Sequence, residues 1–136
     1  MDRARDEQTL AETLPHRPPF RLVDRLVSTD ATVAVATRNV TANDPLASGS
    51  LPAVFLIEAM AQAAALHAGE SLGAHRGYLV AVRDFRCAGE ARVGDILVIT
   101  ATRTGTLGAL QRVHGEIAVD GRIIAHGEFT FAVEVA

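Results

Sequence analysis

The sequence has only one cysteine and no lysine, and these two absences exclude several classes of protein. The single cysteine, Cys87, can form neither an intramolecular disulfide nor a multi-cysteine metal site, and we expect it to be a small buried hydrophobic residue. All thirteen basic residues are arginines, and sixteen acidic residues outnumber them to give a net charge of -3. The charge balance therefore provides no general attraction to nucleic acid or to anionic lipid.

Leader, metal-binding and nucleophile patterns are absent as well. The first residues do not form a charged-then-apolar leader, and we expect a cytoplasmic protein. The histidines lack metal-ligand spacing, so we expect neither a metal nor a cofactor. The glycine turn at residues 105–108 lacks the lysine of a phosphate-binding loop. Ser50 lies in Gly-Ser-Leu-Pro-Ala rather than in Gly-x-Ser-x-Gly, which argues against acyl-enzyme chemistry at this serine.

The composition that is present indicates one globular domain. A chain of 136 residues is too short for two domains with separate cores, and we expect a single domain over residues 1–136. Hydrophobic residues make up 49% of the chain. At this size roughly two thirds of the unfolded surface can be buried on folding, so a core is expected without disulfides or metals.

The segment 52–67 predicts the one long helix, because it is rich in helix formers and begins with a proline. Gly69 lies near its expected end. The segment is apolar nearly all round, which is typical of a helix wrapped by other structure. A membrane span is the alternative, but the apolar stretch is shorter than about 20 residues. It also carries Glu58 and Gln62 in its middle.

Segments rich in β-branched residues predict an antiparallel sheet. They are residues 20–27, 31–40, 78–86, 95–104, 110–119 and 122–133. The last two flank Asp120-Gly121, a strong hairpin signal, and Ile123 and Phe129 are expected on the buried face of the final strand. With one long helix and no helical crossovers, the pattern predicts an α+β fold in which the helix lies against a mostly antiparallel sheet.

Glu58 and Gln62 form the one polar spot within the apolar helix. At a spacing of i, i+4 they lie on the same face. Burial disfavours the charged form of a carboxylate unless it is paired or hydrogen-bonded, and such a group suits proton transfer near neutral pH. The alternative is that Glu58 only anchors the helix or an oligomer contact.

The segment 14–25 is unusual because it places His16 and Arg17 between prolines just before a strand. In one interpretation the prolines set an extended path, and arginines such as Arg17 and Arg21 are solvated or paired with Asp24. In the other, these arginines face an anion, either a phosphate or an acidic partner.

Three stretches, taken together, carry a family resemblance. They are residues 14–25 (LPHRPPFRLVDR), 56–64 (LIEAMAQAA) and 93–95 (VGD). The set resembles the hotdog-fold 3-hydroxyacyl-[acyl-carrier-protein] dehydratases of bacterial fatty acid synthesis. The resemblance implies a hotdog fold, with a long central helix wrapped by an antiparallel sheet and two chains paired around acyl tunnels. The implied reaction removes water from a 3-hydroxyacyl thioester carried on the phosphopantetheine of acyl carrier protein.

One part of the family pattern is missing. The family has a histidine in a Gly-His-Phe-Pro-Gly loop and an acidic residue on the helix, and only the acidic residue matches, at Glu58. Ser50 stands where the histidine would be, and the stretch from there to Glu58 is shorter than in the family. This truncated pattern is similar to divergent dehydratase-like proteins of aryl-polyene and related polyketide-type lipid pathways. It implies a carrier-linked substrate and a sister dehydratase subunit as partner.

Dehydration needs a base, an acid and a donor that stabilises the thioester enolate. Backbone N–H groups at the helix start suit the donor. Loss of one acid–base group typically lowers the rate about 10² to 10⁴-fold, so weak activity could survive. Glu58 could act as both base and acid through a relayed proton, or His16 could approach it. Alternatively, His16 is a structural histidine bonded to backbone.

The leading hypothesis is a 3-hydroxyacyl-[acyl-carrier-protein] dehydratase-like protein of fatty acid or polyene lipid biosynthesis, with Glu58 and His16 as catalytic candidates. The substrate-binding candidates are Ser50, Leu51, Pro52, Phe55 and Gln62, and the carrier-protein contacts are Arg17, Arg21 and Arg86. The expected partners are acyl carrier protein and a second hotdog subunit, in a homodimer or a heterodimer. A non-catalytic acyl-binding or partner subunit and an acyl thioesterase are the alternatives.

Overall fold

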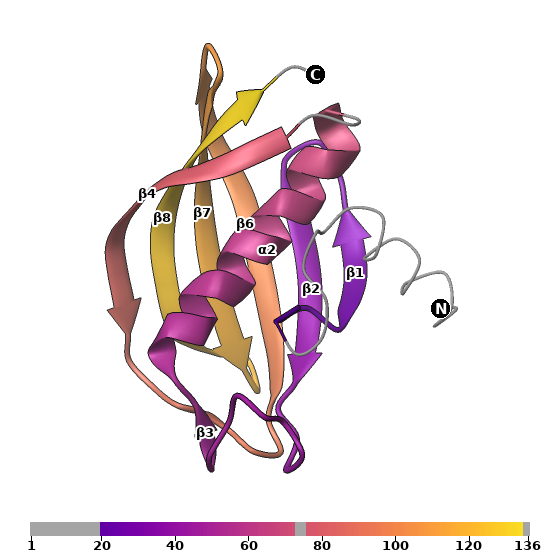
Figure 1. Ribbon diagram of the computed structural model, residues 1–136, viewed down its shortest axis with the longest axis vertical. Coiled ribbons are helices and arrows are strands. Elements are labelled where there is room, and N and C mark those ends of the chain that lie inside the picture. The colour runs from indigo at the N-terminus through magenta and orange to yellow at the C-terminus, as the bar shows by residue number, and fades with distance from the viewer. Residues whose placement is uncertain (1–19, 73–75, 135–136) are drawn as a thin grey trace.

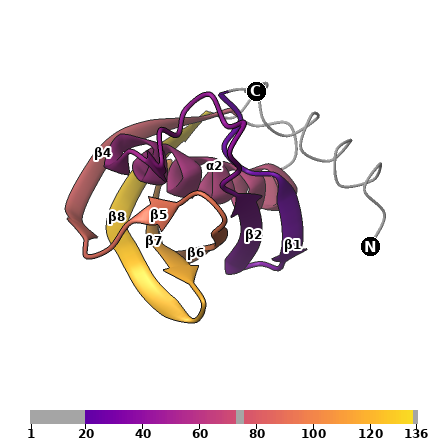
Figure 2. The same cartoon turned by 90° about the horizontal axis from the view of Figure 1, so that it is seen from below.

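The computed structural model describes residues 20–72 and 76–134, and its main feature is one long helix lying against a six-stranded antiparallel sheet (Figure 1). The strand order is β1-β2-β6-β7-β8-β4, and β3 and β5 form a separate short pair. Seen from below, the sheet curves around the helix (Figure 2). The predicted α+β architecture is confirmed. The elements are β1 (Arg25–Thr29), β2 (Val33–Asn39), β3 (Ser50–Leu51), α2 (Ala53–Leu72), β4 (Arg76–Cys87), β5 (Ala91–Arg92), β6 (Ile96–Leu107), β7 (Leu110–Val119) and β8 (Arg122–Glu134).

The core lies between α2 and the inner face of the sheet. Ala59, Met60 and Ala63 of the helix are completely buried. Opposite them, Gly115 on β7 leaves no room for a side chain, because a Cβ there would lie 2.9 Å from the Met60 sulfur and 3.0 Å from the Phe129 ring. Small residues on both surfaces therefore let the helix approach the sheet closely.

Helix α2 begins one residue after Pro52 and is longer than the sequence predicts. It continues through Gly69 and ends at Leu72. A glycine inside a helix costs about 1 kcal/mol relative to alanine, which the surrounding helix formers can outweigh. Within residues 20–72 and 76–134, no helix is both long enough and apolar enough to cross a membrane.

The strands agree with the predicted segments, although their ends differ. Strand β1 begins at Arg25, and residues 20–24, here called the leading segment, precede it. The turn between β1 and β2 is closed by the Asp30 carboxylate, which accepts hydrogen bonds from the backbone N–H groups of Thr32 (2.7 Å) and Val33 (2.8 Å). The short strands β3 and β5 were not predicted, because two-residue strands carry no periodic signal.

Two expectations about single side chains are wrong. Ile123 is 49% exposed, because a register shift between β7 and β8 turns Ile124 into the core instead, where it is 1% exposed. Cys87 is exposed rather than buried, and its thiol donates to the Gly89 carbonyl oxygen at 3.2 Å.

Candidate active site

Glu58 and Gln62 lie one turn apart on α2, and their side chains are in contact. The Gln62 side-chain nitrogen Nε2 donates a hydrogen bond to Oε1 of Glu58 at 3.2 Å. Gln62 is 1% exposed, whereas Glu58 is partly buried. The buried residues Ala59 and Ala63 flank the pair. The site is therefore a carboxyl group in apolar surroundings, with an amide that donates to it.

Gln62 also binds the leading segment, forty residues earlier in the chain. Its Oε1 accepts the Leu22 N–H at 2.7 Å, and its Nε2 donates to the Phe20 carbonyl oxygen at 2.9 Å. Because the amide oxygen is occupied by an N–H donor, the NH₂ group must be the end that faces Phe20 and Glu58. Gln62 thus orients the Glu58 carboxyl group and fixes the path of the leading segment at the same time.

Arg38 and Asp44 are site neighbours that the sequence reasoning missed. Arg38 is 6% exposed and points inward from β2. Its guanidinium donates to the Arg21 carbonyl oxygen at 3.2 Å and to the Asp44 carboxylate. A signal was present in the sequence: the alternation of Ala34, Ala36 and Val40 places residue 38 on the inward face of the strand.

The substrate-binding candidates lie around the start of α2. Ser50 and Leu51 form β3, and Leu51 is 4% exposed and contributes to the core. Pro52 is exposed, and its carbonyl oxygen accepts the Phe55 N–H at 3.0 Å. Phe55 is partly buried against the core. Ser50, Pro52 and Phe55 therefore border the exposed first turn of the helix, while Leu51 serves packing.

The remaining candidates are His16, Arg17, Arg21 and Arg86. His16 and Arg17 lie outside the described residues. Arg21 is only 9% exposed, and its contact with a carrier protein stays a prediction. Arg86 is exposed on β4, where it lies opposite His126 of β8 in the register of the two strands.

A second ionisable cluster lies on the outer face of the sheet, away from α2. His114 Nε2 lies 3.0 Å from Oε1 of Glu116, its Nδ1 contacts Glu128, and the rings of His114 and His126 are 6.2 Å apart. Partial burial lowers the pKa of His114, but hydrogen bonds to Glu128 and Glu116 and the charges of both outweigh it, so the pKa is raised. Since these residues alternate with buried ones, neither histidine can reach Glu58 from this face.

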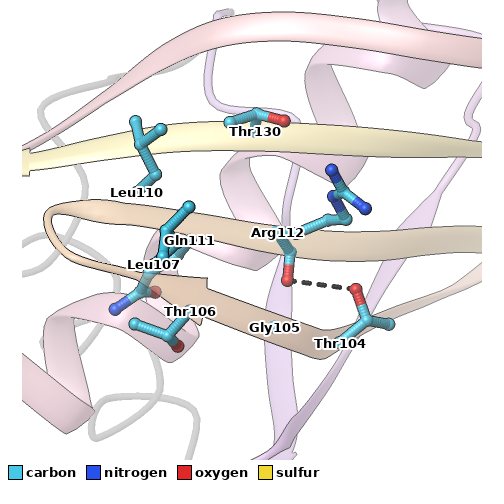
Figure 3. A pocket seen from close by; sticks show the side chains of 8 residues that line it. All are labelled: Thr104, Gly105, Thr106, Leu107, Leu110, Gln111, Arg112 and Thr130. Atoms are coloured by element: carbon cyan, nitrogen blue, oxygen red, sulfur yellow. Dashed lines mark hydrogen bonds between the residues drawn. The ribbon is translucent and has the colours of Figure 1, made fainter.

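A cavity of about 390 Å³ opens at the β6–β7 hairpin, and Glu58 is not among its lining residues (Figure 3). Among the described residues that line it, none is a carboxylate or a histidine. Within the described ranges, no group of three His, Cys, Asp or Glu side chains could hold a metal ion. The lining residues are Thr104, Gly105, Thr106, Leu107, Leu110, Gln111, Arg112 and Thr130.

Sequence comparison finds dehydratases along nearly the whole chain. A sequence model of the ApeP-like family, described as ApeP dehydratase, matches residues 8–134. The 3-hydroxyacyl-[acyl-carrier-protein] dehydratase FabZ of Anaeromyxobacter dehalogenans is 39% identical over 132 residues, which cover 88% of this chain and 85% of the relative. The predicted resemblance to this enzyme family is therefore confirmed.

Comparison of structures supports the same fold. The dehydratase heterocomplex ApeI:P from Xenorhabdus doucetiae matches with a TM-score of 0.80 and 22% identity, over 93% of this chain and 91% of that one. A hypothetical thioesterase with coenzyme A from Streptococcus pneumoniae matches with a TM-score of 0.72 and 16% identity, over 98% and 97%. At these identities the likeness concerns the fold alone. It confirms the hotdog fold but does not separate dehydratase from thioesterase.

Proposed function

The chain belongs to the ApeP-like dehydratase family, and we propose on this premise that it dehydrates 3-hydroxyacyl thioesters carried by acyl carrier protein. The observation that carries the proposal is the partly buried Glu58 carboxyl group, which Gln62 holds at 3.2 Å on the helix. The FabZ relative supports the substrate class. The proposal places the protein in the cytoplasm, in fatty acid or polyene lipid biosynthesis, where carrier-linked acyl chains are made.

Glu58 is the acid–base group in this proposal. A base removes a proton from C2 of the substrate, the C2–C3 double bond forms, and the C3 hydroxyl leaves as water after it receives a proton. If the Glu58 carboxylate takes the C2 proton and returns it to the departing hydroxyl, the reaction balances with water as the only by-product. The N–H groups of Ala53 and Val54, which have no partner within α2, stabilise the thioester enolate oxygen in this proposal, because the next N–H, of Phe55, is bonded to the Pro52 carbonyl oxygen.

A second hotdog subunit is the proposed partner, and it would dock along β4. This strand ends the sheet order, so within the described chain only one of its edges is paired, with β8. Tyr78, Leu79 and Val80 on this strand are between 43% and 60% exposed. An edge strand with exposed apolar side chains is suited to pairing with another chain. The similar ApeI:P structure is itself a heterocomplex, which favours a related but different subunit.

In the heteromer, the partner would supply a second acid–base group in place of the loop histidine that this chain lacks at Ser50, so that Glu58 need not serve as both base and acid. The alternative is a non-catalytic subunit that binds acyl chains, and the missing loop histidine is the observation that supports it. Arg86, which is exposed on β4, remains a proposed contact for the acidic carrier protein, together with Arg17 and Arg21.

The proposal is tested with a 3-hydroxyacyl carrier-protein substrate, the purified chain alone and the chain with a sister dehydratase. Enoyl product and free thiol are followed together. Glu58→Gln is expected to lower enoyl formation about 10² to 10⁴-fold. Glu90→Gln is the matched control, because Glu90 is exposed and pairs only with Arg92 among the described residues.

The other outcomes are equally distinct. Free thiol without enoyl product would identify a thioesterase. Turnover that appears only with the sister subunit, and that Val80→Glu on β4 abolishes, would support a heteromeric enzyme. Enoyl formation that is unchanged by Glu58→Gln in every combination would refute the catalytic role of this residue.

A further inference from the structure

Arg38 is a buried cation that connects three segments of the chain. Its NH1 donates to the Arg21 carbonyl oxygen at 3.2 Å and lies 3.7 Å from the Asp24 carboxylate, while its NH2 bonds to Asp44. The Arg38 side chain is 8% exposed and that of Asp44 is 4% exposed. Removing two charged groups from water costs free energy, so a buried ion pair is weak evidence that the pair stabilises the fold. We therefore considered whether Arg38 has a role other than stability.

The leading segment is held from two opposite sides. Arg38 bonds the carbonyl oxygen of Arg21, and Gln62 bonds the carbonyl oxygen of Phe20 and the N–H of Leu22. In extended chain, neighbouring residues point their backbone groups to opposite sides, so one segment can be gripped by a strand on one side and a helix on the other. A continuous line of contacts thus runs from Arg38 through residues 20–22 to Gln62 and Glu58.

Asp44 extends this line to the loop before α2. Its Oδ1 accepts the Leu46 N–H at 3.0 Å, and its own N–H donates to the Thr41 carbonyl oxygen at 3.1 Å. The loop continues into Ser50 and the start of α2, where the first N–H groups of the helix lie. Arg38 therefore ties together the two parts of the proposed site, which are the Glu58 carboxyl group and the helix start.

We propose that Arg38 is a positioning residue for Glu58, acting through the leading segment and Gln62. The proposal rests on the proposed dehydratase function. Its physical basis is the planar fork of the guanidinium, which bonds Arg21 and Asp44 at the same time. A lysine keeps the positive charge beside Asp44 but presents a compact ammonium, which cannot reproduce this fork.

The test compares Arg38→Lys with the wild type and with the exposed control Glu90→Gln, each assayed with any sister subunit that activity requires. Arg38→Lys is expected to lower kcat about 10 to 100-fold with KM almost unchanged, because misplacement of a catalytic group by about 1 Å has effects of this size. Amide hydrogen exchange at the Leu22 N–H should become faster while the global unfolding midpoint stays close to that of the wild type. Glu90→Gln should change neither quantity.

A milder variant covers the case in which Arg38→Lys does not fold. Asp24→Asn removes the negative charge that lies 3.7 Å from Arg38, on a side chain that is 44% exposed. Its remaining side-chain oxygen can still accept the Asn39 N–H, which Oδ2 of Asp24 accepts at 2.7 Å in the wild type. The variant should therefore produce the same two effects at smaller size. Unchanged kcat, or a lower kcat with unchanged Leu22 exchange, would overturn the proposal, because the line of contacts would then not transmit the change. If the wild type turns over no substrate, the proposed function fails separately. Leu22 exchange and the Gln62 side-chain NMR signals then still decide whether Arg38 positions this side of the site.

Discussion

Replacing Gln62 by leucine should measure how much stability the hydrogen bonds of its side chain provide. The substitution keeps the side-chain volume but removes the acceptor of the Leu22 N–H, a group on a residue that is 1% exposed. A buried donor without a partner costs about 1–3 kcal/mol. Loss of the hydrogen bond to the Phe20 carbonyl oxygen costs less free energy, because Phe20 is 66% exposed and water can replace this bond.

Leucine at a buried position recovers part of this loss through apolar burial, so we expect the lower half of the range, about 1–2 kcal/mol. For a domain of this size, that corresponds to a fall in Tm of about 4–8 °C. Urea and thermal unfolding measure the change. Gln111→Leu is the matched control, because Gln111 is also buried but borders the hairpin cavity, where water can replace lost hydrogen bonds (Figure 3). It should lose less stability.

The same variant should release the leading segment, so Leu22 amide exchange should rise more than exchange in the central strands. If Gln62→Leu unfolds with the wild-type midpoint and Leu22 remains protected, the hydrogen bonds to Gln62 do not hold this segment. The reasoning about both the helix and the site would then be refuted.

Two further predictions concern the sheet. Gly115→Ala should lower the free energy of unfolding by about 1–3 kcal/mol, because the new Cβ would lie 2.9 Å from Met60 and 3.0 Å from Phe129. Urea unfolding measures this change, and a stability equal to that of the wild type would contradict the close packing of the helix on the sheet. The pKa of His114 is raised by Glu128 and Glu116 despite burial, so its stabilising contribution is fully present below the unfolded-state value near 6.5 and is lost as pH rises through the folded-state pKa. The difference in free energy of unfolding between the wild type and His114→Gln should therefore be larger at pH 6 than at pH 9. A difference that is equal at the two pH values, or larger at pH 9, would contradict this prediction.

Local patterns in the sequence were sufficient for the main elements. The helix formers after Pro52 predict α2, and Asp120-Gly121 predicts the β7–β8 hairpin, in which both residues have positive φ angles of 50° and 77°. The i, i+4 spacing of Glu58 and Gln62 also predicts their shared face, since helix geometry depends only on neighbours within a turn. These features can be predicted from the sequence because each one depends only on residues that are close together in the chain.

The tertiary structure decided the features that join distant segments. The bonds from Gln62 to residues 20 and 22, and from Arg38 to Asp44 and Arg21, depend on how the helix, β2 and the leading segment pack. No local pattern specifies such partners, because many polar side chains could satisfy a buried backbone group, and only the fold brings one within reach. The sequence by itself determined the hotdog elements and the carboxyl group on the helix. Which groups hold that carboxyl group in place was decided only when the elements packed together.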